Sequence, residues 1–515
     1  MGRICLDSGD REKAEKIFGY VLKRDPLNAE AAYALGRYGI MSGISTAEAR
    51  IAADWLMTEG RYSYAFGFLS KYTEISGKTG CMTELYLAYA AKMSGDSYAD
   101  RIASAEKALD ASAPAFARTL RDREVLRALG DENSFVVPYR RGNLEYDAGN
   151  ADVAEEQWRK ATAAAPERYE AYRNLALCSF NKKHDPGSAL GYMEKAFGLS
   201  SGDPRVLSEL CGLYRAVGKD SAFIRALLEK YPRSVLERDD LYAEYCSVLA
   251  DTGEVGRDYE LLTSRNFHPW EGGEGKVTGL YKRVNVALAA RCAAGGDFVG
   301  ATERLRACLT FPRNLGEGKL ALDLDNDVHY LMGTYYEKLG RGEEARTSFE
   351  AATRGDLRVA DMNYYNDNPV EYVFYAALAF GKLGNRDKEK EIKDSLLRYC
   401  AEHADDRAEI DYFAVSLPDM LVWDQDIAAK NRAFTDKVKA LAAALEEDLC
   451  SRADRRHRDK DRRGSERVDR AQIRHAVTRV RISGTLPTRR RREIRRLDSV
   501  EERSRGQTAL CLTDG

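Results

Sequence analysis

The sequence has few helix-breaking residues and no long apolar run. Only 12 of its 515 residues are proline, and most of them lie between segments of helical period. No apolar stretch approaches the roughly 18 to 20 residues of a membrane-spanning helix. The N-terminal sequence MGRICLDSGDREK lacks the apolar core of a secretion signal. These absences predict a soluble, mostly helical, cytoplasmic protein with no membrane partner.

The sequence also lacks the common signatures of metal and nucleotide chemistry. Its ten cysteines are scattered without a C-x-x-C pair, and its six histidines form no H-E-x-x-H motif. The GEGK sequence at 273–276 does not complete a phosphate loop, because Trp270 and Val277 stand where glycine and serine or threonine are required. We therefore expect a reducing compartment and neither a metal ion nor another cofactor.

The sequence does contain a recurring order of small and large residues. Gly333 is followed after twelve residues by Ala345 and then by Phe349. Small residues at two positions let antiparallel helices cross closely, while larger ones such as Met332 and Tyr336 fill the space between hairpins. Further copies, complete or partial, comprise Gly142, Ala154, Trp158, Ala161 and Pro166; Leu175, Ala189, Met193 and Ala196; Ala301, Leu305, Cys308 and Pro312; and Ala14, Phe18, Val21 and Pro26.

This order resembles the tetratricopeptide repeat, a pair of helices with a period of about 34 residues. The resemblance implies an all-α fold, namely a tetratricopeptide-type superhelical solenoid of antiparallel helix pairs. We expect an inserted Gly-rich structured loop at 263–279 and a disordered basic tail. The alternative is a non-repetitive α-helical bundle, which needs no recurring order of small and aromatic residues.

Four regions are expected along the chain. Degenerate N-terminal helical repeats occupy 1–130, a tetratricopeptide array occupies 131–262, a family-specific helical repeat region occupies 263–445, and the basic tail occupies 446–515. Large apolar residues within 410–430 are expected to form an apolar layer that ends the stack of helices. They are Tyr412, Phe413, Leu417, Leu421 and Trp423.

Both ends of the chain are unusual. Gly2 precedes Ala14 by the same twelve-residue step, so half of a first helix is absent, which predicts a fragment; a frayed native end is the alternative. From Ser451 onward, 19 arginines and one lysine stand against ten acidic residues. We favour out-of-frame translation as the cause, over a genuine disordered tail or a nucleic-acid-binding arm, so a nucleic-acid partner is not expected.

The last third of the chain is also similar to a more particular group. It resembles the C-terminal repeat region of a bacterial family of unknown function, in which the repeats follow an N-terminal β-sandwich similar to galactose mutarotase. No residue here corresponds to that β-sandwich, and the resemblance implies a connection with carbohydrates. The matching segments are RNFHPWEGGEGKV at 265–277, PRNLGEGKL at 312–320, DNDVHYLMG at 325–333, MNYYNDNPVEYVFYAALAFGKLG at 362–384 and IDYFAVSLPDMLVWDQD at 410–426.

Polar and aromatic residues outside the repeat pattern are the candidate ligand-binding residues. They lie in the Gly-rich loop, near a second GEGK sequence at 316–319 with Glu317 and Lys319, and in two polar stretches further on. On one concave face they would suit a polar ligand such as a sugar. Alternatively, Trp270 fills a core and both GEGK loops connect helices through local ion pairs. The candidates are His268, Trp270, Glu271, Glu274, Lys276, Asp325, Asp327, His329, Tyr364, Tyr365 and Asp367.

Two functions from different classes follow. The first is a non-catalytic scaffold that binds a protein or peptide segment in its concave groove. The second is a carbohydrate-binding or glycoside-processing module that uses the block at 268–367. Glycoside hydrolysis needs two carboxyl groups about 5 to 10 Å apart, and only Glu271 and Glu274 with Asp325 or Asp327 are candidates. No complete catalytic motif is present, so we favour the scaffold and name no catalytic residue.

Overall fold

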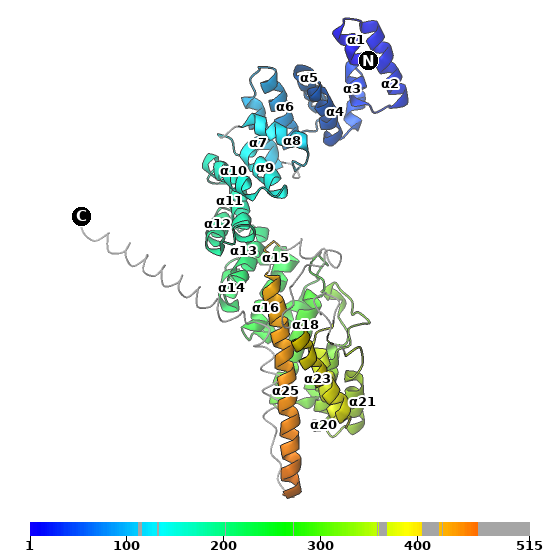
Figure 1. Cartoon of the computed structure of the whole chain (residues 1–515), viewed down its shortest axis with the longest axis vertical. Coiled ribbons are helices and arrows are strands. Elements are labelled where there is room, and N and C mark those ends of the chain that lie inside the picture. Colours follow the sequence, from blue (N-terminus) through cyan, green and yellow to red (C-terminus); the bar gives the residue numbers. More distant parts are fainter. Residues whose placement is uncertain are drawn as a thin grey trace, which may run out of the picture. The chain divides into compact units, whose positions relative to one another are not determined.

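The structure of the chain is a computed structural model that describes residues 1–111, 116–130, 133–200, 202–270, 272–357, 359, 368–403, 422–424 and 426–461. The chain divides into two units, Met1–Ser201 and Gly202–Gly515. Figure 1 labels the helices of both. Among the described residues every regular element is helical, and no strand occurs.

The first unit is a succession of short helices joined by tight turns. Its elements are α1 (Gly2–Asp7), α2 (Arg11–Arg24), α3 (Ala29–Ala34), the 3₁₀ helix η1 (Tyr38–Gly43), α4 (Thr46–Thr58), α5 (Tyr62–Ser76), α6 (Cys81–Met93), α7 (Ala99–Ala111), α8 (Leu120–Leu129), α9 (Val136–Asp147), α10 (Ala151–Ala164), α11 (Tyr169–Asn181) and α12 (Pro186–Leu199).

The second unit continues the same alternation of helix and turn. Its elements are α13 (Pro204–Ala216), α14 (Ser221–Leu228), α15 (Pro232–Glu237), α16 (Asp239–Asp251), α17 (Val255–Ser264), α18 (Lys276–Ala294), α19 (Phe298–Ala307), the 3₁₀ helix η2 (Arg313–Leu315), α20 (Asn326–Lys338), α21 (Gly342–Ala352), α22 (Glu371–Lys382), α23 (Arg386–Glu402) and α25 (Ile427–Asp461). The interval between α17 and α18 contains the expected Gly-rich loop.

Close crossing of paired helices explains the glycines of the repeat. A methyl group added to Gly142 in α9 would lie 2.5 Å from the indole nitrogen of Trp158 in α10. One added to Gly333 in α20 would lie 2.7 Å from the ring of Phe349 in α21, and Gly2 in α1 faces α2 in the same way. Hairpins of both units therefore share one helix crossing, and the tetratricopeptide-type all-α fold is confirmed.

The second small position of the repeat is an alanine in most hairpins and an aspartate in one. Ala14, Ala154 and Ala345 are all buried there. In the hairpin α16–α17, Cys246 and Asp258 keep the same twelve-residue step. Both carboxylate oxygens of Asp258 are buried without a hydrogen bond of ordinary geometry. Burial raises the pKa of Asp258 from 3.8 to about 7, although the neighbouring Cys246 thiol opposes the shift.

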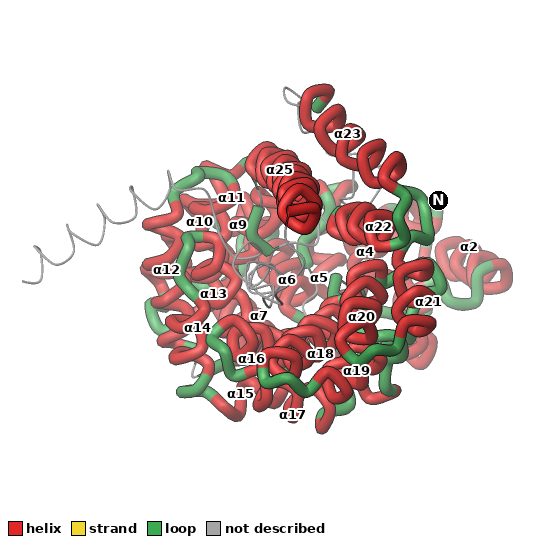
Figure 2. The backbone as a smooth tube through the Cα atoms, turned by 90° about the horizontal axis from the view of Figure 1, so that it is seen from below, coloured by secondary structure: helices red, strands yellow, loops and turns green. Residues whose placement is uncertain are grey.

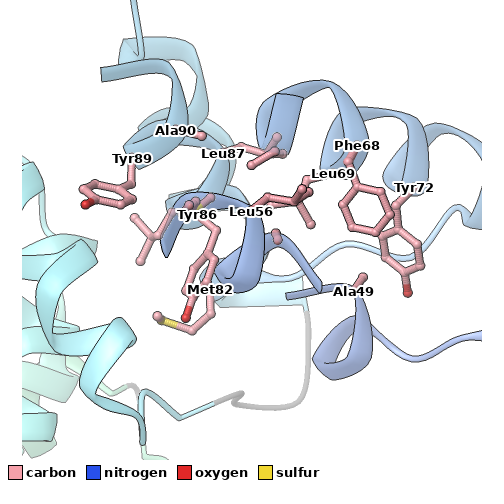
Figure 3. Packing of buried hydrophobic residues seen from close by; sticks show 14 of the residues in the cluster. Ala49, Leu56, Phe68, Leu69, Tyr72, Met82, Tyr86, Leu87, Tyr89 and Ala90 are labelled. Carbon is pink, nitrogen blue, oxygen red and sulfur yellow. The ribbon is translucent and has the colours of Figure 1, made fainter. Parts of the chain in front are cut away.

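The apolar core of the first unit is densest around α6. Residues 81–91 of this helix are all buried, because α5, α7 and α8 pack against it. Figure 3 shows Tyr86, Leu87 and Tyr89 of α6 among the side chains of α4 and α5. Of the aromatic residues at 55–68, Phe68 is buried, whereas Trp55 is 64% exposed. A helix buried on every face departs from the amphipathic repeat pattern, which explains the degenerate sequence here.

The last described helix covers the final hairpin. Helix α25 packs on α22 and α23 through the buried side chains Val438, Ala442 and Leu445, and it is drawn in orange in Figure 1. It runs to Asp461, beyond Leu445, where the sequence placed the end of the helical region. Trp423 contacts α13. Tyr412, Phe413, Leu417, Leu421 and the tail from 462 onward lie outside the described residues.

The helix crossing yields a first prediction. Replacing Gly333 with alanine should destabilise the chain by about 1–3 kcal/mol, because the new Cβ would force the Phe349 ring out of place. Thermal unfolding followed by circular dichroism measures the effect. Gly342→Ala is the matched control, since its Cβ would enter open space on α21. Equal melting temperatures for the two variants would contradict the crossing.

The buried aspartate yields a second prediction. In the unfolded chain Asp258 loses its proton near pH 4, whereas in the folded chain it keeps the proton up to about pH 7. The stability of the wild type should therefore fall as the pH rises from about 4 to about 7, and the penalty is complete above that range. Asp258→Ala should remove this dependence and raise the melting temperature at pH 8.

Urea unfolding at pH 5 and pH 8 checks this second prediction. Each pKa unit corresponds to about 1.4 kcal/mol, so the gain at pH 8 should be on the order of a few kcal/mol. Asp147→Ala, at an exposed aspartate of α9, serves as the control and should leave the pH dependence unchanged. An Asp258→Ala chain that unfolds with the wild-type pH dependence would show that Asp258 ionises normally.

Candidate functional site

The Gly-rich loop of residues 265–275 is held against the segment that follows α19. The backbone N–H of Phe267 donates to the carbonyl of Asn314 at 2.7 Å. The side-chain amide of Asn314 in turn donates to the carbonyls of Leu262 and Arg265, each at 2.8 Å. These bonds satisfy backbone groups that α17 leaves unpaired where it ends. The loop therefore follows a fixed course between α17 and α18.

The second GEGK sequence caps the helix that starts in the first. The carboxylate of Glu317 accepts hydrogen bonds from the backbone N–H of Gly275 at 3.0 Å and from the Thr278 hydroxyl at 3.3 Å. A negative charge at a helix N-terminus is favourable because the first N–H groups of a helix have no partner within it. The two loops thus form one structural unit at the start of α18.

Asp239 at the start of α16 fixes the other end of the Gly-rich loop. Its carboxylate accepts hydrogen bonds from the backbone N–H of His268 at 2.9 Å and from the Arg265 guanidinium at 2.6 Å. The guanidinium also stacks 4.4 Å from the centre of the Tyr242 ring. Burial opposes the ionisation of Asp239, but these hydrogen bonds outweigh it and hold its pKa below the ordinary value.

Two lysines and three aspartates meet beside α18 and α20. The ammonium nitrogen of Lys282 lies 2.6 Å from one carboxylate oxygen of Asp325 and 3.3 Å from Asp327. The ammonium nitrogen of Lys319 lies 2.6 Å from the other oxygen of Asp325 and 2.8 Å from Asp323. We call this group, together with the phenol that completes it, the lysine–aspartate cluster: Lys282, Lys319, Asp323, Asp325, Asp327 and Tyr372.

The charges of the cluster shift the pKa values of three of its groups. Burial disfavours the ammonium of Lys282, but the three carboxylates outweigh it and raise its pKa to about 12. Burial likewise opposes the ionisation of Asp323, but Lys282 and Lys319 hold its pKa below the ordinary value. Burial and the nearby carboxylates raise the pKa of Tyr372, whose hydroxyl donates to Asp323 at 2.7 Å. The cluster is therefore a compensated ionic network.

An unusual backbone turn places the central carboxylate of the cluster. Asp325 precedes α20 and has the left-handed conformation, with φ of 50°, which aspartate tolerates better than most residues. The next residue, Asn326, donates from its side chain to the carbonyls of Ala352 and Arg354 at 2.7 and 2.9 Å. The turn is thus fixed to the end of α21 and holds the Asp325 carboxylate between the two lysines.

The structure brings together some of the candidate residues from the sequence. Asp325 and Asp327 meet in the lysine–aspartate cluster. His329 follows on α20, half-buried, and burial lowers its pKa. His268 lies apart from the cluster, with its ring 86% exposed and its Nδ1 atom 3.2 Å from Asp239. The segment 316–325 connects the start of α18 with the cluster, because its Glu317 caps α18 and its Lys319 pairs with Asp325.

The remaining candidates do not join the cluster. Trp270 is half-buried and covers Gly273, whose backbone N–H donates to the Trp270 carbonyl at 2.9 Å. Glu274 and Lys276 are exposed. Four further candidates lie outside the described residues: Glu271, Tyr364, Tyr365 and Asp367.

Sequence reasoning missed three residues that organise this region. Lys282 lies within the regular helix α18, so nothing in its local pattern distinguishes it from a solvated lysine. Asp239 stands at a helix start, where acidic residues are common, and Tyr372 was expected only as part of a resembling segment. The signal in each case is a partner distant in the sequence, which only the folded chain shows.

Polar side chains also connect the first helices of successive hairpins in the second unit. Arg215 of α13 pairs with Glu244 of α16 at 2.5 Å, and Arg283 of α18 pairs with Asp251 of α16 at 3.0 Å. Figure 2 shows α18 and α20 on the inner side of this unit, with α19 and α21 outside them. We call this set of half-exposed polar residues the inner-face row: Ser208, Arg215, Asp240, Glu244, Asp251 and Arg283.

Comparison with known proteins identifies part of the chain directly. The tetratricopeptide repeat family matches residues 1–63 and 139–204, so these two stretches carry tetratricopeptide repeats. The second stretch includes the α9–α10 hairpin in which Gly142 faces Trp158. No helix of the described residues is long and apolar enough to span a membrane. Among the same residues, no group of histidine, cysteine and acidic side chains could hold a metal ion.

The chain is also similar to solved structures of tetratricopeptide-repeat proteins. The C-terminal part of a repeat-containing protein from Cytophaga hutchinsonii is 16% identical, with 58% of this chain and 92% of that chain covered and a TM-score of 0.25. A repeat protein from Parabacteroides merdae is 17% identical, with coverages of 55% and 95% and a TM-score of 0.25. The tetratricopeptide domain of P58(IPK) is 14% identical, with coverages of 75% and 98% and a TM-score of 0.21. At these TM-scores the similarities carry no argument about function.

The ionic network yields a third prediction. Replacing Lys282 with methionine should destabilise the chain by on the order of 3–5 kcal/mol, because it removes the ammonium group that lies beside Asp327 and one of the two that lie beside Asp325. Lys276→Met, at an exposed lysine of the same helix, is the control. Urea unfolding measures both variants. A Lys282→Met chain as stable as the control would mean that the cluster is open to water.

Proposed function

We propose that the chain is a non-catalytic tetratricopeptide-repeat scaffold that binds a protein or peptide segment along its inner face. The observation that supports this most is the inner-face row. Its side chains are held in place by neighbours on the next helix and remain partly exposed, at 36% for Arg215 and 38% for Arg283. Positioned polar groups of this kind lose little side-chain entropy when they bind an extended chain.

The charges of the row favour a polar peptide over an apolar ligand. Each arginine stands beside a carboxylate, as Arg215 beside Glu244, so the surface presents donors and acceptors in alternation. An extended peptide backbone has the same alternation of N–H and C=O groups. A segment with both acidic and basic side chains would complement the row, and the partner is therefore a protein segment rather than a nucleic acid.

The carbohydrate hypothesis stays a prediction without a supporting observation. In the described residues, Trp270 packs on Gly273, and the carboxylates of Asp325 and Asp327 face lysines. Helix capping by Glu317 accounts for the second GEGK loop. The connector interpretation of both loops thus explains their composition without a sugar.

Selection of peptides from a random display library against the full chain tests the proposed function. Peptides that bind the wild type should lose at least tenfold in affinity for the double variant Arg215→Glu, Arg283→Glu, because two donors of the row become acceptors. The control is Arg346→Glu, at a side chain of α21 that is 71% exposed. Peptides that bind all three chains equally would place the binding surface elsewhere.

A further inference from the structure

A tryptophan from the end of the second unit contacts the beginning of that unit. The indole N–H of Trp423 donates to the backbone carbonyl of Glu209 in α13 at 2.8 Å, across 214 positions of sequence. The Trp423 side chain is only 8% exposed. It lies over Gly212, where an added methyl group would be 3.2 Å from the indole ring. The contact combines a hydrogen bond with a close fit.

The contacted surface of α13 belongs to the inner face. Glu209 and Gly212 are three residues apart and so lie on the same side of the helix. Ser208 and Arg215 of the inner-face row flank Gly212 at positions four before and three after it. Leu210 points to the buried side of α13. Trp423 therefore occupies one end of the surface to which the proposed function assigns a partner.

The chemistry of this contact selects for tryptophan. Gly212 has no side chain, so a flat ring can lie directly on the helix. The carbonyl of Glu209 already closes a helical turn and accepts the indole N–H as a second donor. Phenylalanine would fill the space without the hydrogen bond, and aliphatic side chains would not match the flat surface. A buried indole commonly needs such a polar partner.

We propose that the Glu209–Gly212 surface of α13 is a binding site for an extended segment with a tryptophan, and that Trp423 occupies this site in the free chain. The inference rests on the proposed function and adds the kind of partner. A partner segment enters by replacing one indole with another. Both indoles would make the same contacts with α13. The occupant of the site therefore depends on the concentration of the partner relative to the effective concentration of Trp423 within the same chain.

The test uses the full chain and a fluorescein-labelled peptide of residues 415–428, followed by fluorescence anisotropy. Trp423→Ala should bind this peptide at least tenfold more tightly than the wild type, because the site is vacated. Adding Gly212→Leu to Trp423→Ala should abolish the binding. The same peptide with alanine at position 423 should bind neither chain. Equal binding to wild type and Trp423→Ala, binding that survives Gly212→Leu, or no binding by any chain would overturn the proposal.

A second measurement distinguishes loss of the binding site from misfolding of a variant. Gly212→Leu in the otherwise native chain should expel Trp423 and shift its emission to longer wavelength, with Trp423→Phe as the reference spectrum and far-ultraviolet circular dichroism unchanged. An unshifted emission in the folded variant would contradict the site. The display selection described above separates the two proposals, through peptides that lose affinity for the double variant Arg215→Glu, Arg283→Glu. If such peptides bind Trp423→Ala and wild type equally, the scaffold proposal stands and the tryptophan site fails. If the selection yields no such peptide, both proposals fail.

Discussion

The hairpins α1–α2, α9–α10 and α20–α21 depend on the close crossing of their two helices, and this crossing depends on a position that cannot hold a side chain. At Gly142 and Gly333 even one methyl group would overlap the aromatic ring of the second helix. Since each repeat of a solenoid packs only on its neighbours, no distant core can compensate for a poorly formed hairpin. In these hairpins the glycine and the aromatic residue therefore determine how closely the two helices pack.

The same crossing also organises the surface. In hairpins such as α18–α19 and α20–α21 the second helix covers one side of the first, so the opposite side of the first helix is left for other contacts. In the second unit this side carries residues such as Arg215 and Arg283, which bridge to α16. The inner-face row is thus a consequence of repeated packing, and its partly exposed charges are positioned by the fold before any partner arrives.

What the sequence could and could not predict follows from the range of each interaction. The order of Gly333, Ala345 and Phe349 is local, so it appears directly in the sequence, and the Gly-rich loop lies between α17 and α18 within the expected 263–279. The pair Lys282–Asp325 spans 43 positions of sequence and the pair Trp423–Glu209 spans 214. The helical periodicity of a short segment cannot indicate pairs so far apart. The expected end layer of residues 410–430 stays a prediction, because most of the segment lies outside the described residues; of its five named residues, Trp423 contacts α13.

The second unit buries acidic side chains in two different environments. In the lysine–aspartate cluster every carboxylate has an ammonium group nearby, so burial is compensated and α18 is linked to the residues at the start of α20. Asp258, in a position where the hairpins of Ala14, Ala154 and Ala345 have alanine, is less well compensated: Cys246 and Arg283 oppose the effect of burial, but burial still raises its pKa to about 7. The hairpin that contains it, α16–α17, also supplies Glu244 to the inner-face row. A hairpin with a buried aspartate therefore also carries charges of the inner-face row, and because each repeat packs only on its neighbours, the unfavourable residue affects that hairpin and its neighbours rather than the whole chain.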